Sequence, residues 1–124
     1  MRSAGFAAAA EAHDLEALIV TLDPDCVFRS PAVFKPYHGA PAIREVLGVV
    51  MQTFEDFRYV DQIEQDDRAV LVFMTRVGGR EVHGIDMLRF GADGRITELT
   101  VMVRPLSAAI ALAQAVGARL AAPA

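Results

Sequence analysis

Apolar residues near both ends of the chain and in its middle recur with the 3.6-residue period of an α-helix. The first predicted helix covers residues from about 3 to 22, with a bend or break near His13-Asp14 and a stop at Asp23-Pro24, because proline ends a helix. A second helix is predicted over residues 41–54, and a closing helix from Leu106 to about Leu120. The apolar positions are Leu15, Leu18, Ile19 and Leu22 in the first helix, and Ile43, Val46, Leu47, Val50, Met51 and Phe54 in the second.

The period falls to two from residue 57 onward, as is typical of half-buried strands. A shorter strand is predicted at residues 26–30, before a proline-rich loop. Gly78-Gly79 suits a two-residue hairpin and Gly91–Gly94 a four-residue turn, so the last three strands should form an antiparallel meander. The successive strands are predicted at residues 57–65, 69–77, 81–90 and 95–104.

These turns define a strand register, and the register places Asp86, a carboxylate inside the apolar stretch HGIDMLRF. Pairing across the Gly-Gly turn sets Asp86 opposite Leu71. If Phe90 pairs with Arg95 across the second turn, the other neighbour of Asp86 is Leu99. Both predicted neighbours are apolar.

Side chains alternate along a strand, so Asp86 shares its face with apolar residues and points into the interior. Burial without a neighbouring cation should raise the pKa of this carboxyl, leaving it neutral near pH 7 and able to donate a hydrogen bond. The residues predicted on the same face are Val82, Gly84, Leu88 and Phe90.

The opposite face of the predicted sheet is also partly apolar and needs a cover. One layer of helices covers only one face, so the economical solution is a second copy of the sheet in a twofold homodimer. The apolar residues expected there are Val70, Val72, Met74, Ile85, Met87, Ile96 and Met102. The polar part would comprise Arg76, His83, Arg89, Glu98, Thr100 and Arg104.

Length and composition limit the remaining possibilities. The 124 residues fit one domain (residues 1–124), and with 53% hydrophobic and 23% charged residues the chain should be folded and soluble. A net charge of −4 without a basic cluster argues against nucleic acid or an anionic membrane as a partner. The single Cys26 is expected in the core, and no metal-ligand spacing or cofactor motif is present. The N-terminus lacks an adequate signal-peptide core, so the expected location is cytoplasmic.

The order of the motifs HDLEALIVTLDPDCVFRSPAV, HGAPAIREVL and IDMLRFGADGRITEL resembles the nuclear transport factor 2-like superfamily. This superfamily includes ketosteroid isomerases, SnoaL-like polyketide cyclases and limonene epoxide hydrolases. The resemblance covers nearly the whole chain. It implies an α+β fold, a cone-shaped barrel whose curved, mostly antiparallel sheet wraps around helices and encloses an apolar pocket. It also implies dimerisation through the outer sheet face.

The resemblance carries one catalytic group of the ketosteroid isomerases onto this chain. Asp86 matches their protonated Asp, which helps to form the oxyanion hole. Ser30 occupies the position of their general base, and Phe6 that of their oxyanion-hole Tyr, so ordinary ketosteroid isomerase chemistry is not expected. The Asp–Arg–Asp arrangement of the epoxide hydrolases is replaced by Ala69, Leu71 and Val101, which excludes that activity.

The expected site is therefore an apolar pocket around Asp86 that binds a small apolar metabolite bearing a carbonyl or hydroxyl. Asp86 would act as acid or oxyanion donor in an isomerase- or cyclase-like enzyme, or would bond a buried Ser30, Tyr37 or Tyr59 in a non-catalytic binding or structural module. No general base is identified: His38 is an alternative at the pocket rim, whereas His13 and His83 are not expected to converge on Asp86. The expected ligand-binding residues are Phe6, Phe28, Ser30, Tyr37, Met51, Phe54, Tyr59, Leu71, Leu88, Leu99, Val101 and Val103.

Overall fold

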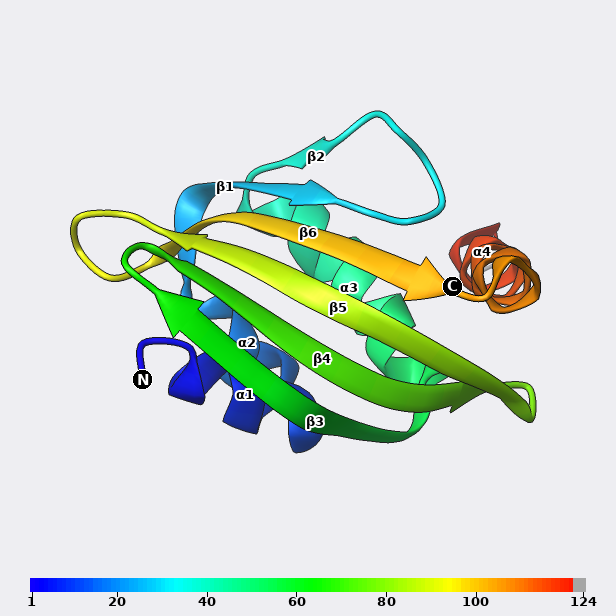
Figure 1. Ribbon diagram of the computed structural model, residues 1–124. Helices are drawn as coiled ribbons and strands as arrows, with labels where there is room; N and C mark the ends of the chain where they lie inside the picture. The colour runs from blue at the N-terminus through cyan, green and yellow to red at the C-terminus, as the bar shows by residue number, and fades with distance from the viewer. Residues whose placement is uncertain (122–124) are drawn as a thin grey trace.

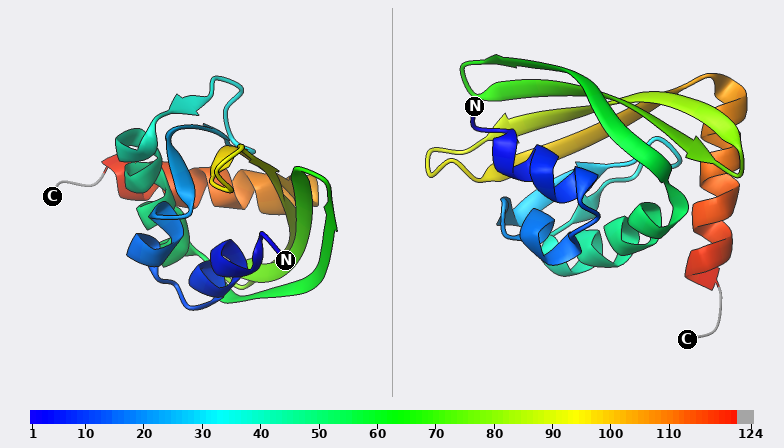
Figure 2. Two further views of the ribbon diagram at one scale, coloured as in Figure 1. Left: turned by 90° about the vertical axis from the view of Figure 1, so that its left-hand side faces the viewer. Right: turned by 90° about the horizontal axis from the view of Figure 1, so that it is seen from below.

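The chain folds around one curved sheet of six strands, shown in Figure 1 as a computed structural model that describes residues 1–121. The elements are α1 (Ala4–Glu11), α2 (Leu15–Ile19), β1 (Leu22–Arg29), β2 (Tyr37–His38), α3 (Ala40–Thr53), β3 (Glu55–Gln65), β4 (Arg68–Val77), β5 (Arg80–Phe90), β6 (Ile96–Arg104) and α4 (Leu106–Ala121). The strand order is β2-β1-β6-β5-β4-β3, with β1 parallel to β6 and the other neighbours antiparallel. Figure 2 shows the sheet curving around α1, α2 and α3, while α4 stands at one end. The predicted α+β class is confirmed.

The first predicted helix is two helices, separated at His13. The backbone N–H of Asp14 donates to Ala9 O and that of His13 to Ala10 O, which closes α1 with His13 in the left-handed region, at φ 55°. Asp14 then starts α2, because its Oδ1 accepts a hydrogen bond from the backbone N–H of Ala17 at 3.1 Å. The predicted break is confirmed.

The prediction that the first helical segment continues to about residue 22 is wrong. Helix α2 ends at Ile19, and Leu22 is the first residue of β1, where it pairs with Ile96. A buried leucine fits a helical stripe and a strand equally well, so its spacing alone could not separate the two. Strand β1 therefore begins earlier than predicted, and its register is irregular between Leu22 and Val27. The proline-rich loop also contains a short strand, β2, that was not predicted.

The meander confirms most of the predicted register. Asp86 lies opposite Leu71, but its neighbour on β6 is Val101 and not Leu99. The chain turns one residue later than predicted, so that Phe90 pairs with Ile96, and a bulge before the next pair adds a second residue of shift. A shift of two residues preserves the face, so Asp86 still points inward.

Because of this shift in register, one residue that was predicted on the outer face of the sheet lies on its inner face. Ile96 is 1% exposed and belongs to the core, because it pairs with inward-facing Phe90. The other apolar residues predicted there do alternate with the buried face and are partly or fully exposed. Cys26 lies in the main core cluster, as expected.

Candidate functional site

A largely apolar cavity lies between the inner face of the sheet and the helices. Its volume is about 100 Å³, smaller than the roughly 150 Å³ of an engineered cavity that holds benzene. The exposed residues His13 and Ala32 are among those that line it, so a ligand of several rings could extend outward past them. The wall is built from α1, α2, α3, α4 and the strands β1, β2, β3, β5 and β6, together with the loop after β1.

Most of the predicted ligand-binding residues line this cavity together with Asp86. They are Phe6, Phe28, Ser30, Tyr37, Met51, Phe54, Tyr59, Leu99 and Val101. Leu71, Leu88 and Val103 do not: Leu71 and Leu88 are packed in the main core cluster, and Val103 packs in a second cluster near α4. Sharing the inner face with Asp86 therefore does not by itself bring a residue to the cavity, because helices cover part of that face.

Asp86 and Tyr59 form the polar centre of the cavity. The Tyr59 hydroxyl donates a hydrogen bond of 2.6 Å to Asp86 Oδ2. Within residues 1–121 this is the one hydrogen bond of the Asp86 carboxyl, so Oδ1 remains available to a ligand. The structure thereby selects Tyr59 from the three expected partners. Ser30 Oγ instead accepts hydrogen bonds from the backbone N–H groups of Ala32 and Val33.

The surroundings of this pair shift both pKa values upward. Asp86 is 7% exposed, and burial raises its pKa from 3.8 to about 7, an effect that the hydrogen bond from Tyr59 partly opposes. Burial also raises the pKa of Tyr59, and the negative charge of Asp86 raises it further. Near neutral pH the pair therefore offers a carboxyl that can exist in its neutral, donating form beside a phenol that keeps its proton.

Three contacts hold Tyr59 in this position. Its backbone N–H donates to Glu11 Oε2 at 3.1 Å, which ties β3 to the end of α1. Its ring lies edge-on to Phe57, with centroids 5.0 Å apart, and edge-on to Phe73 at 6.5 Å. These contacts restrict the ring and direct its hydroxyl toward β5.

Several lining residues were missed or misjudged from the sequence. Phe57 of β3 and Leu112, Ala113 and Val116 of α4 line the cavity. His13, which was not expected to converge on Asp86, is an exposed residue that lines the same cavity, and no hydrogen bond joins the two side chains within residues 1–121. His38 does not line it, and His83 lies on the outer face beside Arg104. The unusual position of His13, between two helices and next to a capping Asp, was the available signal.

The described part of the chain shows no other chemical centre of comparable kind. No group of three or more His, Cys, Asp or Glu side chains within residues 1–121 is placed to hold a metal ion. Burial, together with the charges of Asp23 and Glu98, raises the pKa of the Cys26 thiol to about 11, so it stays protonated and unreactive. None of the described helices has the length and apolar character needed to cross a membrane.

The family model described as the SnoaL-like domain matches residues 4–99, which is most of the chain. The chain belongs to this family. The predicted relationship to SnoaL-like and nuclear transport factor 2-like proteins is thus confirmed. No curated protein sequence matches this SnoaL-like chain.

Solved structures agree with the family assignment. A steroid delta-isomerase from Pseudomonas aeruginosa is 46% identical, with a TM-score of 0.91 over 97% of this chain and 89% of that one. An uncharacterised protein with a cystatin-like fold from Silicibacter pomeroyi DSS-3 is 28% identical, also with a TM-score of 0.91, over 95% and 84%. An NTF2-like protein of unknown function from Cytophaga hutchinsonii ATCC 33406 is 18% identical with a TM-score of 0.67, over 84% and 88%, and shows the fold alone.

Proposed function

We propose that this SnoaL-like protein binds a small, largely apolar molecule through a carbonyl or hydroxyl oxygen, and that Asp86 donates a hydrogen bond to that oxygen. One observation carries the proposal: a buried carboxyl with an uncommitted oxygen lies in a cavity whose other lining residues are mostly apolar. Such a pocket offers apolar contact for the body of a ligand and a single polar group to orient it.

The same geometry suits an isomerase- or cyclase-like proton transfer. With Tyr59 donating to Oδ2, a neutral Asp86 presents the proton on Oδ1 to the ligand, and this hydrogen bond strengthens as negative charge develops on a carbonyl oxygen. The 46% identical relative bears the name of a steroid delta-isomerase, which supports this reaction class. Ser30 and Phe6 line the cavity but supply neither a carboxylate base nor a phenol, so the substrate and the base need not match that enzyme.

Replacing Asp86 with leucine should weaken ligand binding about tenfold or more, since the ligand oxygen loses its donor, while Asp86→Asn should retain most of the affinity. Isothermal titration with a panel of keto steroids and smaller cyclic enones measures the effect, and circular dichroism checks the fold. Thr75→Val is a matched control, because Thr75 is buried, donates to Glu55 O and lies outside the cavity. Unchanged affinity in Asp86→Leu would refute the role of Asp86.

We also infer that the protein forms a homodimer through the outer face of the sheet. Two cross-strand rows on this face are apolar: Ile63, Val70 and Met87 form one, and Val72, Ile85 and Met102 form the other. Met102 is 51% and Ile63 57% exposed, and a group of exposed apolar side chains on one face is typical of an interaction surface.

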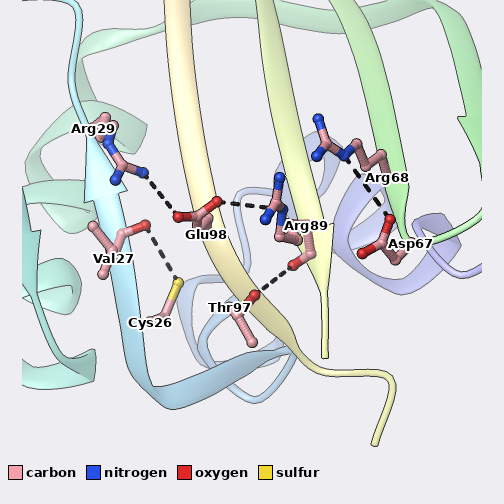
Figure 3. A network of polar contacts seen from close by, with 8 residues as sticks. All are labelled: Cys26, Val27, Arg29, Asp67, Arg68, Arg89, Thr97 and Glu98. Carbon is pink, nitrogen blue, oxygen red and sulfur yellow. Dashed lines mark hydrogen bonds and ion pairs between the residues drawn. The ribbon is translucent and has the colours of Figure 1, made fainter. Parts of the chain in front are cut away.

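Charged side chains border these apolar rows. Glu98 lies 3.4 Å from Arg29 and 3.5 Å from Arg89. Figure 3 shows Glu98 between these two arginines, with Arg68 paired to Asp67 nearby. An apolar centre with a polar edge is the usual anatomy of a protein interface.

Met87→Glu should therefore shift the protein from dimer to monomer, because it places a charge within one of the apolar rows. Light scattering distinguishes the 13.4 kDa chain from a particle of twice that mass. Val20→Glu is the control, since Val20 is 73% exposed but follows α2, away from the sheet face. A monomeric unmodified protein in dilute solution would remove the inference.

A further inference from the structure

The loop between β1 and β2, residues 30–36, carries a fully exposed aromatic side chain at its tip. This residue is Phe34, and every other aromatic ring within residues 1–121 is at least partly buried. Val33, the residue before it, is about half exposed. A phenylalanine in water gains none of the free energy that burial of its ring would provide. The ring of Phe34 therefore adds nothing to the core and is free to pack against another apolar surface.

Both ends of this loop belong to the wall of the cavity. Ser30 and Ala32 line the cavity on the side of β1, and Tyr37 lines it where β2 begins. Tyr37 stacks on Phe28, with ring centroids 5.8 Å apart. Ser30 Oγ accepts hydrogen bonds from the backbone N–H groups of Ala32 and the residue after it. The base of the loop is therefore fixed in the wall of the cavity.

The tip of the loop is not held in this way. Within residues 1–121, no hydrogen bond or ion pair joins Phe34 or Lys35 to another residue. Pro31 and Pro36 stand on either side of the tip, and each restricts the backbone at its own position. The tip can therefore change its position between these two prolines without breaking a hydrogen bond.

Helix α4 supplies another part of the cavity wall near this loop. Leu112, Ala113 and Val116 line the cavity from α4, and the exposed Ala32 lines it from the loop. Figure 1 and Figure 2 show the loop extending toward α4. The cavity volume is about 100 Å³, so a ligand of several rings leaves part of its body outside. A ligand that extends outward past Ala32 places that part beside Phe34.

We propose that Phe34 is a ligand-contacting residue, and that the tip of its loop closes over the part of a large ligand that extends out of the cavity. This role rests on the proposed binding of an apolar molecule at Asp86. Closure removes the ring of Phe34 and the outer part of the ligand from water together, which stabilises the complex. A ligand that fits wholly inside the cavity gains nothing from closure. The loop therefore selects the length of a ligand, whereas Asp86 selects its oxygen.

Phe34→Ser should weaken the binding of a four-ring keto steroid about tenfold or more, because the steroid loses its apolar cover. The affinity for cyclohex-2-enone, a ligand of one ring, should change less than about twofold. Isothermal titration measures the binding of the steroid, and an NMR titration measures that of the smaller enone. Phe34→Leu keeps an apolar side chain at the tip and should retain most of the affinity for the steroid.

Val20→Ser is the matched control for Phe34→Ser. Val20 is also a strongly exposed apolar residue, but it follows α2 and does not line the cavity. This variant should bind both ketones as the wild type does. The thermal midpoint of the ligand-free protein should be the same in both serine variants and the wild type, because neither side chain is buried.

Closure of the loop can be observed directly, because the chain contains no tryptophan. Phe34→Trp places a single fluorescent indole at the tip of the loop. Its emission should be that of a solvated indole in the free protein and should shift to shorter wavelength when the steroid binds. Cyclohex-2-enone should leave the emission unchanged, since it fits inside the cavity.

Three results would contradict the proposal. Equal affinity of Phe34→Ser and the wild type for the steroid, or an unshifted emission of Phe34→Trp with the steroid bound, would overturn it and leave binding at Asp86 intact. An emission shifted without ligand, and restored by dilution of the protein, would also overturn it, because Phe34 would then contact another chain. Failure of the wild type to bind any ketone would refute the proposed function itself, and the role of Phe34 with it.

Discussion

Replacing Asp86 with asparagine is expected to remove a large pH-dependent loss of stability. The folded-state pKa of Asp86 is about 7, above its ordinary 3.8. Between these values the folded protein holds a proton that the unfolded chain has released, so the free energy of unfolding falls as the pH rises. The loss is complete above the folded pKa and amounts to about 4 kcal/mol. Asparagine has no proton to lose, yet its side-chain oxygen can still accept the Tyr59 hydrogen bond.

Urea unfolding of the wild type and Asp86→Asn between pH 4 and pH 8 measures this effect. The free energy of unfolding of the wild type should fall relative to that of Asp86→Asn as the pH rises. The difference between the two should become constant above a pH of about 7. Tyr59→Phe provides a second check: it removes the hydrogen bond that lowers the pKa of Asp86, so the loss of stability should extend to higher pH. A constant difference across the range would show that Asp86 is an ordinary solvated carboxylate.

Gly84→Ala is expected to be strongly destabilising, although the change adds one methyl group. A Cβ at Gly84 would overlap Phe73 Cζ and lie 2.8 Å from the backbone oxygen of Met102. Phe73 is fully buried and packs against Phe54 and Phe57, so it cannot move aside without disturbing them. Overpacking of this kind costs about 3 kcal/mol. Because Phe73 also contacts Tyr59, the hydrogen bond to Asp86 should loosen as well.

Gly117→Ala is the matched control for this substitution. Gly117 lies in α4, where a Cβ would meet nothing within 4 Å, so alanine should stabilise the helix by about 0.5–1 kcal/mol. Chemical denaturation of both variants at one pH compares them directly. Equal stability of Gly84→Ala and the wild type would mean that the packing of Phe73 on β5 is much looser than described.

The inward direction of Asp86 could be predicted because it depends only on alternation along β5 and on the Gly78-Gly79 turn. The identity of its neighbour on β6 could not be predicted. The register of β5 with β6 is shifted by a longer turn and a bulge, and neither leaves a clear mark in the sequence. The predicted neighbour of Asp86 was Leu99 and the observed one is Val101, but Asp86 remains on the inner face of the sheet. For Ile96 the same local shift reversed the face.

The candidate site was harder to predict than the fold because its members come from elements far apart in the chain. Tyr59 could be named only as one of three partners, since its hydrogen bond to Asp86 depends on how the sheet curves to bring β3 toward β5 although β4 lies between them. His13 could not be placed, because its direction follows from the left-handed closure of α1 and not from any periodicity. Residues of α4 such as Leu112 gave no signal that distinguishes a cavity wall from ordinary core.

The parallel pairing of β1 with β6 has a consequence for the order in which the molecule forms. Strands β3 to β6 pair with their neighbours in the sequence and can assemble early, whereas β1 must wait for the last strand of the chain. The cavity takes walls from both β1 and β5, so it exists only after this late closure. A small molecule that fits it would therefore find nothing to bind in partly formed chains. Its expected effect is to slow unfolding of the finished protein while leaving the rate of folding unaltered.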